Sequence, residues 1–199
     1  MRSYIFLLLG LFLLFGAIVY ITVKDATSER PEQTALMDYV WNMQSDEENL
    51  PTAASKLTLS RFSLAIDDTL TANRISSYKG NRMSELLRPT GERLWFAMNE
   101  QTPEGIIVAN VKEPVRMGGK HRSIDLFHLY NKARATVGTD EQIRYFEFEG
   151  QSMLAACLPD REDIYLTASA AMLLDLPAGQ KIPAEQVIQQ MKEWINQRQ

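Results

Sequence analysis

The sequence predicts an α+β domain that follows a single N-terminal transmembrane helix. Residues 4–23 contain neither a charged side chain nor a proline. Further along, short apolar runs occur in pairs separated by turn residues, which is typical of antiparallel strands. Amphipathic helical segments lie between these pairs and do not alternate regularly with single strands. We therefore expect one antiparallel sheet with helices packed on one face.

The N-terminal segment has the length of a membrane anchor. A helix rises about 1.5 Å per residue, so about 20 apolar residues cross a hydrocarbon core roughly 30 Å thick. A cleavable signal peptide has a shorter apolar core and small residues before the cut, whereas residues 18–21 are Ile, Val, Tyr and Ile. The sequence predicts an uncleaved anchor over residues 4–23, and a cleaved signal peptide is the alternative.

The charges that flank the anchor set its expected orientation. Residues 1–3 form a short flank that contains Arg2, and Lys24 and Arg30 follow the anchor among acidic residues. Acidic residues count little in the positive-inside rule, and a short flank before one anchor favours a cytoplasmic N-terminus. We expect the bulk of the chain outside the cytoplasm, in the periplasm if the membrane is a bacterial inner membrane. A domain that faces the cytoplasm is the alternative.

The composition of the chain after the anchor limits the kinds of domain that it can form. Residues 24–34 are polar and predict a linker, and residues 35–199 predict one domain. The net charge of −4 and the pI of about 5.3 argue against a nucleic-acid partner, which needs a basic surface. A lone cysteine, Cys157, rules out a disulfide framework and a CxxC site.

The first predicted element of the domain is a juxtamembrane helix over about residues 35–45. Its apolar residues recur at spacings of three and four, and Pro51 follows the charged segment that ends it. This face packs on the domain or binds a partner, which is another envelope or membrane protein or a second copy in a homodimer. The residues of this candidate partner-binding face are Leu36, Tyr39, Val40 and Met43.

The next segments predict strands separated by polar loops. Residues 56–67 alternate with a change of parity at Arg61, which indicates a bulge or two short strands, with a helix as the alternative. Residues 68–91 are polar and predict a loop with one helical turn. Residues 93–98 and 105–111 are apolar runs with a short connection, so they predict a hairpin.

Helices and strands share the C-terminal half. Residues 142–150 and 152–159 predict a hairpin, residues 163–168 a third strand and residues 169–179 a short helix. Two longer helices flank this region. The face of the first contains Ile124, Phe127, Tyr130 and Ala133, and Gly138 ends it. The face of the C-terminal helix contains Val187, Ile188, Met191, Trp194 and Ile195.

No residue pattern supports catalysis, a cofactor or a metal. His121 and His128 are seven residues apart, whereas helical metal pairs are four apart. Ser76 and Lys79 match S-x-x-K, but the accompanying motifs of penicillin-recognising enzymes are missing from the sequence. We therefore assign no catalytic, cofactor-binding or metal-binding residue.

A pair of glutamates and a glycine-rich basic loop are the remaining polar features, and each has a functional and a simpler structural interpretation. Glu147 and Glu149 lie two residues apart, so they predict the solvated face of a strand more than a carboxylate pair. A candidate anion-binding loop precedes the first long helix, because glycine amides and a helix N-terminus attract anions; a solvated loop is the simpler interpretation. The residues of this candidate loop are Gly118, Gly119, Lys120 and Arg122.

Together these features predict a non-enzymatic, membrane-anchored binding or accessory domain. Such a domain serves as an envelope complex subunit, an assembly factor or the sensory partner of a signalling protein. The alternative is a membrane-anchored hydrolase with an unrecognised serine or carboxylate site.

We predict that the mature protein keeps its N-terminal anchor, because the apolar segment lacks a cleavage pattern. Mass spectrometry of the membrane-bound protein is expected to find the N-terminal peptide. An N-terminus near residues 25–30 contradicts the prediction.

Overall fold

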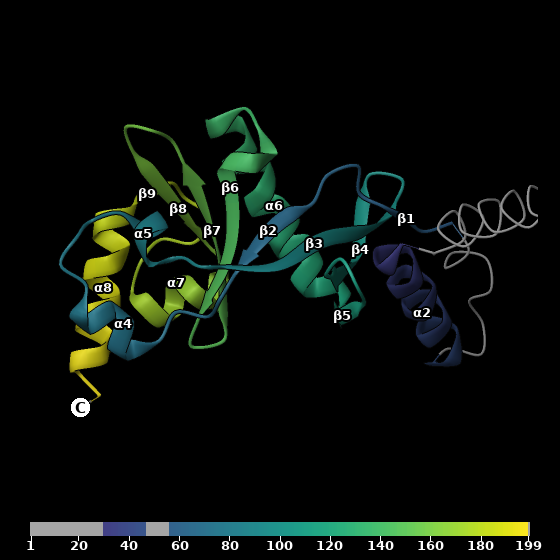
Figure 1. Ribbon diagram of the computed structural model, residues 1–199, viewed down its shortest axis with the longest axis horizontal. Coiled ribbons are helices and arrows are strands. Elements are labelled where there is room, and N and C mark those ends of the chain that lie inside the picture. The colour runs from purple at the N-terminus through teal and green to yellow at the C-terminus, as the bar shows by residue number, and fades with distance from the viewer. Residues whose placement is uncertain (1–29, 47–55, 199) are drawn as a thin grey trace, which may run out of the picture. The chain divides into compact units, whose positions relative to one another are not determined.

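The computed structural model describes residues 30–46 and 56–198. The chain divides into Met1–Arg30 and a compact unit, Pro31–Gln199, and the second unit is an α+β domain (Figure 1). The predicted anchor over residues 4–23 lies outside the described residues. Among those that are described, no helix combines the length and the apolar character that a membrane crossing requires.

The first described helix, α2 (Pro31–Asp46), begins earlier than the sequence predicts. The expected linker extended to residue 34. Pro31 can occupy the first helical turn because the amide hydrogen that it lacks would have no helical partner there. Residues 31–34 are polar, so no apolar periodicity marked the first turn of the helix.

A mostly antiparallel sheet forms the centre of the domain, as predicted. Its strand order is β5-β4-β3-β2-β6-β7-β8-β9, and β1 pairs with β3. Within the described sheet, β2 and β6 are parallel and the other neighbours are antiparallel. The strands are β1 (Thr58–Leu59), β2 (Leu64–Asp67), β3 (Pro89–Asn99), β4 (Thr102–Ala109), β5 (Pro114–Gly118), β6 (Ile143–Phe148), β7 (Gln151–Cys157), β8 (Glu162–Leu166) and β9 (Ile182–Pro183).

The predicted hairpins are confirmed, and so is the division of the first strand segment into two short strands, β1 and β2. The β6–β7 turn contains Glu149 and Gly150, both with positive φ, as a two-residue hairpin turn requires. Strand β5 was not predicted from the sequence. Its residues are mostly exposed, so no apolar alternation marks it as a strand.

Helices cover both faces of the sheet, whereas the sequence predicted a single covered face. One face carries α6; the other carries α2 at one end and four short or C-terminal helices at the other (Figure 1). The central strands are apolar on both sides: Tyr145 faces α6 and Phe146 faces α8. Both sides therefore need a cover. The further helices are α4 (Ala72–Ser77), α5 (Met83–Leu86), α6 (Lys120–Val137), the 3₁₀ turn η1 (Asp140–Gln142), α7 (Ala168–Leu174) and α8 (Ala184–Asn196).

The face of α6 differs in part from its prediction. Tyr130 and Ala133 are buried as expected, and Gly138 ends the helix at φ +80°. Phe62 stacks on Tyr130 with ring centroids 3.9 Å apart. Ile124, in contrast, is 41% exposed, because the buried side is completed by Leu126 and Leu129.

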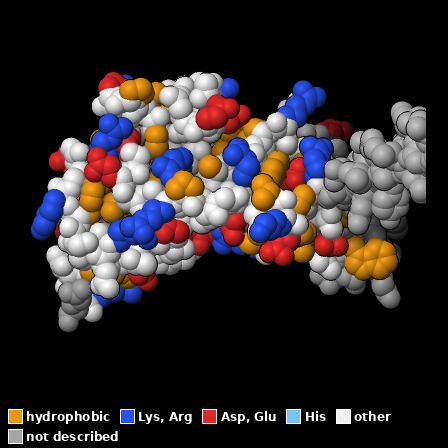
Figure 2. Space-filling view, in the orientation of Figure 1, with side chains coloured by type: hydrophobic (Ala, Val, Ile, Leu, Met, Phe, Trp, Pro, Cys, Tyr) orange, Lys and Arg blue, Asp and Glu red, His pale blue; other side chains and the backbone are white. Residues whose placement is uncertain are grey.

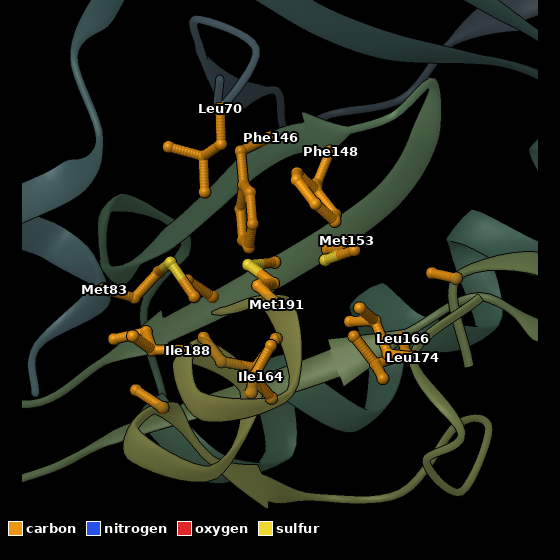
Figure 3. Close-up of a cluster of buried hydrophobic side chains, with 14 of the residues drawn as sticks. Leu70, Met83, Phe146, Phe148, Met153, Ile164, Leu166, Leu174, Ile188 and Met191 are labelled. Atoms are coloured by element: carbon orange, nitrogen blue, oxygen red, sulfur yellow. The ribbon is translucent and has the colours of Figure 1, made fainter. Parts of the chain in front are cut away.

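The C-terminal helix α8 belongs to the core, as its apolar face predicted. Figure 3 shows Met191 pointing toward Phe146, with Phe148 and Met153 beside it. Trp194 lies at the margin of this cluster, edge-on to Phe148 with centroids 5.3 Å apart. The helix thus closes one end of the sheet face.

Replacing Met191 by alanine tests this packing. Met191 is fully buried, so Met191→Ala is expected to lower the free energy of unfolding by about 2–5 kcal/mol. Gln186→Ala, on the exposed side of the same helix, is the matched control and is expected to change it by less than about 0.5 kcal/mol. Urea unfolding followed by circular dichroism measures both. If both substitutions lowered the free energy of unfolding equally, α8 would not be part of the core.

Candidate functional site

Exposed apolar side chains gather on a few neighbouring elements. Of the eight large apolar side chains that are exposed in the described residues, seven lie on α2, on the β4–β5 hairpin or near the start of α6; Met172 on α7 is the eighth. Since α2 packs against β4 and β5, these elements adjoin one another. The seven are Met37, Trp41, Met43, Val111, Val115, Met117 and Ile124.

Tyr39 fixes α2 on the sheet. Its hydroxyl donates to the carbonyl of Glu104 over 2.6 Å. Its ring covers Gly105, where an added Cβ would lie 2.3 Å from the ring carbon Cζ, so a larger residue at position 105 would displace α2. Burial, together with the Glu104 carboxylate, raises the pKa of Tyr39, which keeps the hydroxyl protonated as a donor.

The domain itself covers most of the predicted partner-binding face. Leu36 is buried, and Tyr39 and Val40 pack against the cluster that includes Ile107. Met43 remains 37% exposed. The helix face that the periodicity singled out is therefore the one that attaches α2 to its own sheet, and partner binding there stays a prediction.

The outward side of α2 exposes a different pair, Met37 and Trp41, which we call the α2 ridge. Met37 is 51% exposed and Trp41 is 73% exposed. They are four residues apart, so they lie together on one side of the helix. Figure 2 shows an apolar side chain standing out over α2. The sequence signal for this ridge is a tryptophan that lies outside the apolar periodicity of the helix.

The β4–β5 hairpin presents a second apolar group. The Asn110 side chain accepts hydrogen bonds from the backbone amides of Lys112 (2.8 Å) and Glu113 (3.0 Å), which fixes the turn and leaves Val111 at its tip, 89% exposed. Strand β5 pairs with β4 and forms one edge of the described sheet. Val115 and Met117 are 40% and 44% exposed along it.

The predicted anion-binding loop is a strand–helix junction. Gly118 is the last residue of β5, Gly119 caps α6 with a φ of −77°, and Lys120 is the first helical residue. Lys120 forms an ion pair with Glu104 (2.7 Å). Arg122 is likewise engaged with a carboxylate, so neither cation faces solvent alone, and anion binding here stays a prediction.

Arg122 joins α6 to the sheet through a polar cluster with Tyr145, Glu147 and Ser152. Its Nη2 atom lies 2.5 Å from the Tyr145 hydroxyl, 2.5 Å from Glu147 Oε1 and 2.8 Å from Ser152 Oγ. Burial and the hydrogen bond to Glu147 raise the pKa of Tyr145 to about 12, and the two acidic partners raise the pKa of Arg122 although its burial opposes this. These groups satisfy one another, so the cluster is suited to holding α6 in place.

The expectation of a solvated face for Glu147 and Glu149 is therefore wrong for Glu147. Its side chain is 15% exposed and is covered by Arg122 of α6. Glu149 lies in the β6–β7 turn with a φ of 50°. Strand alternation cannot reveal that a distant helix supplies a cation to the polar face.

The other chemical candidates lie apart from one another. Ser76 and Lys79 are exposed, and α4 ends at Ser77 between them. His121 and His128 are exposed, and the described part of the chain holds no cluster of three or more metal-ligating side chains. Burial, with a contribution from Glu162, raises the pKa of Cys157 to about 11, so its thiol is protonated at neutral pH.

Comparison with protein-family models, with curated proteins and with solved structures finds no match to this chain. The α2 ridge and the hairpin are thus defined by exposure and contacts alone.

Removing one hydroxyl tests the Arg122 cluster. Tyr145→Phe deletes the hydroxyl that contacts three polar partners, including the Glu147 carboxylate, and is expected to lower the free energy of unfolding by about 1.5–3 kcal/mol. The control Tyr165→Phe deletes a buried hydroxyl that pairs with Thr136 and is expected to cost about 0.5–1.5 kcal/mol. Urea unfolding compares the two. A smaller loss for Tyr145→Phe than for Tyr165→Phe contradicts the assignment.

Proposed function

We propose that the chain is a single-pass, membrane-anchored, extracytoplasmic binding protein that is not an enzyme. Its α2 ridge docks on another envelope protein, in the manner of a complex subunit, an assembly factor or a sensory partner. The anchor is residues 4–23, and the domain lies in the periplasm of a bacterial inner membrane. The anchor and orientation are supported by the sequence, and the docking surface is supported by the exposure of α2.

The exposure of Trp41 carries the proposal. Tryptophan is among the residues that dominate binding energy at protein interfaces, and clustered exposed apolar side chains mark interaction surfaces. Trp41 has Met37 one turn away, and Tyr39 holds the helix that presents them. The ridge therefore stands on a fixed support, which reduces the entropy lost on binding.

The acidic character of α2 indicates which charge the partner surface carries. The helix carries the acidic residues Glu32 and Asp38, and its sequence has no Lys or Arg. A partner surface that accepts the ridge is expected to offer an apolar hollow with basic residues at its rim, because complementary charges favour correct encounter.

A hydrolase remains the alternative from the sequence, but no side-chain arrangement in residues 30–46 and 56–198 favours it. Ser76 and Lys79 lie exposed on the surface. Ser152 is buried and bonded to Tyr145 and Arg122. Within the described residues, Ser152 is thus a member of a structural cluster with no histidine or lysine among its hydrogen-bond partners.

A photo-crosslinking amino acid at position 37 of the full-length, membrane-embedded protein tests the docking. We expect an adduct with a second, different protein that Trp41→Ala abolishes, because the ridge acts as one contact. The crosslinker at position 186, on the exposed side of α8, is the control and is expected to give no such adduct.

Two outcomes contradict this proposal. An adduct of twice the chain's own mass identifies a second copy as the occupant of the ridge. Adducts of equal yield at positions 37 and 186 indicate contacts without specificity.

A further inference from the structure

We propose that the β4–β5 hairpin rests on the anionic surface of the membrane that anchors the chain, with Val111 inserted among the lipid headgroups. This inference rests on the membrane anchorage in the proposed function. It concerns a different surface from the α2 ridge and a different kind of occupant.

The hairpin presents an apolar tip on a fixed turn. Val111 is 89% exposed, and the Asn110 side chain holds the turn beneath it through two hydrogen bonds to backbone amides. A further bond joins the Asn110 amide to the Glu113 carbonyl (3.1 Å). Val115 and Met117 continue the apolar exposure along β5. Such a tip can enter a headgroup region without unfolding the turn.

The same segment is basic within an acidic protein. The whole chain has 25 acidic and 21 basic residues, but residues 111–122 contain four Lys or Arg and a single acidic residue, Glu113. Arg116 and Arg122 pair with Glu147, and Lys120 pairs with Glu104, but the three basic side chains stay 44%, 46% and 55% exposed. Figure 2 shows basic, apolar and acidic side chains side by side over β4 and β5. Basic and apolar side chains in combination favour the surface of an anionic bilayer.

The length of chain between the anchor and the domain makes the bilayer the nearest large surface. Residues 24–30 are the seven residues between the predicted anchor and α2. Fully extended, seven residues span at most about 25 Å. The chain enters the domain at α2, and α2 packs against both strands of the hairpin. The short linker therefore limits how far the hairpin can lie from the bilayer.

A second copy fits β5 poorly. Antiparallel pairing of β5 with itself about its centre places Arg116 opposite its own copy, and like charges directly opposite each other destabilise a strand pair. Pro114, at one end of the strand, has no amide hydrogen to donate. A lipid surface meets neither obstacle.

The test places a single cysteine at position 111 of the full-length protein, in a Cys157→Ser background, and labels it with an environment-sensitive fluorophore. The protein is reconstituted in phosphatidylcholine bilayers with or without phosphatidylglycerol. We expect a blue-shifted emission that spin-labelled lipids quench, with quenching stronger in the presence of phosphatidylglycerol. A label at position 186 on α8 is expected to show neither effect.

Charge reversal supplies the matched comparison. Lys112→Glu is expected to reduce the quenching at position 111 severalfold. Lys79→Glu makes the same change at an exposed lysine after α4 and is expected to leave the quenching unchanged. Equal effects of the two variants overturn the role of the hairpin's charge.

The remaining outcomes separate this inference from the proposed function. Absence of quenching at position 111, with the anchor intact by mass spectrometry of the same sample, overturns hairpin docking alone. A blue shift without lipid quenching, accompanied by crosslinks between copies, assigns the surface to a second copy and also overturns it. Loss of the anchor overturns the proposed anchorage.

Discussion

The fold depends on the parallel pairing of β2 with β6. Strands β5, β4, β3 and β2 form one antiparallel set, β6 to β9 form another, and the β2–β6 pair joins them within the described sheet. Arg144 on β6 forms an ion pair with the buried carboxylate of Asp67 at the end of β2. Leu70 extends the junction, since its amide donates to the carbonyl of Glu147 over 2.8 Å. The residues that meet here are far apart in the chain, so this pairing decides the relative position of both halves.

The ion pair orients this junction more than it stabilises it. Burial raises the pKa of Asp67, and the Arg144 guanidinium, which lowers it, compensates only in part. Asp67 Oδ2 has no hydrogen-bond partner among the described residues. A buried pair of this kind costs desolvation energy that offsets much of its Coulombic attraction, so it adds little net stability while it joins β6 to the end of β2. A second buried carboxylate, Glu162, is better satisfied: burial raises its pKa, but bonds from Ser84 and Arg82 outweigh this and hold the pKa below its ordinary value.

The same arrangement determines which surfaces remain for binding. Because α6 and α8 close the two faces of the central strands, six of the eight large apolar side chains that are exposed in the described residues lie on α2 and on the edge hairpin; the others are Ile124 on α6 and Met172 on α7. The two groups differ in charge: α2 has acidic residues and no Lys or Arg, whereas the segment around β5 is basic. That difference is the physical basis for proposing a protein partner for the first and a lipid surface for the second.

The sequence by itself determined the class of the fold, the β3–β4 and β6–β7 hairpins and the buried face of α8, because apolar periodicity and turn residues are local signals. It did not reveal β5, whose exposed residues carry no alternation. The apolar periodicity predicted a partner-binding face on the side of α2 that packs on the sheet, because regular apolar spacing indicates burial and does not distinguish a binding surface. Only the tertiary structure decided that Arg122 covers Glu147 and that Met37 and Trp41 are exposed. Both results depend on contacts between α6 or α2 and strands distant in the chain, and no local pattern records such contacts.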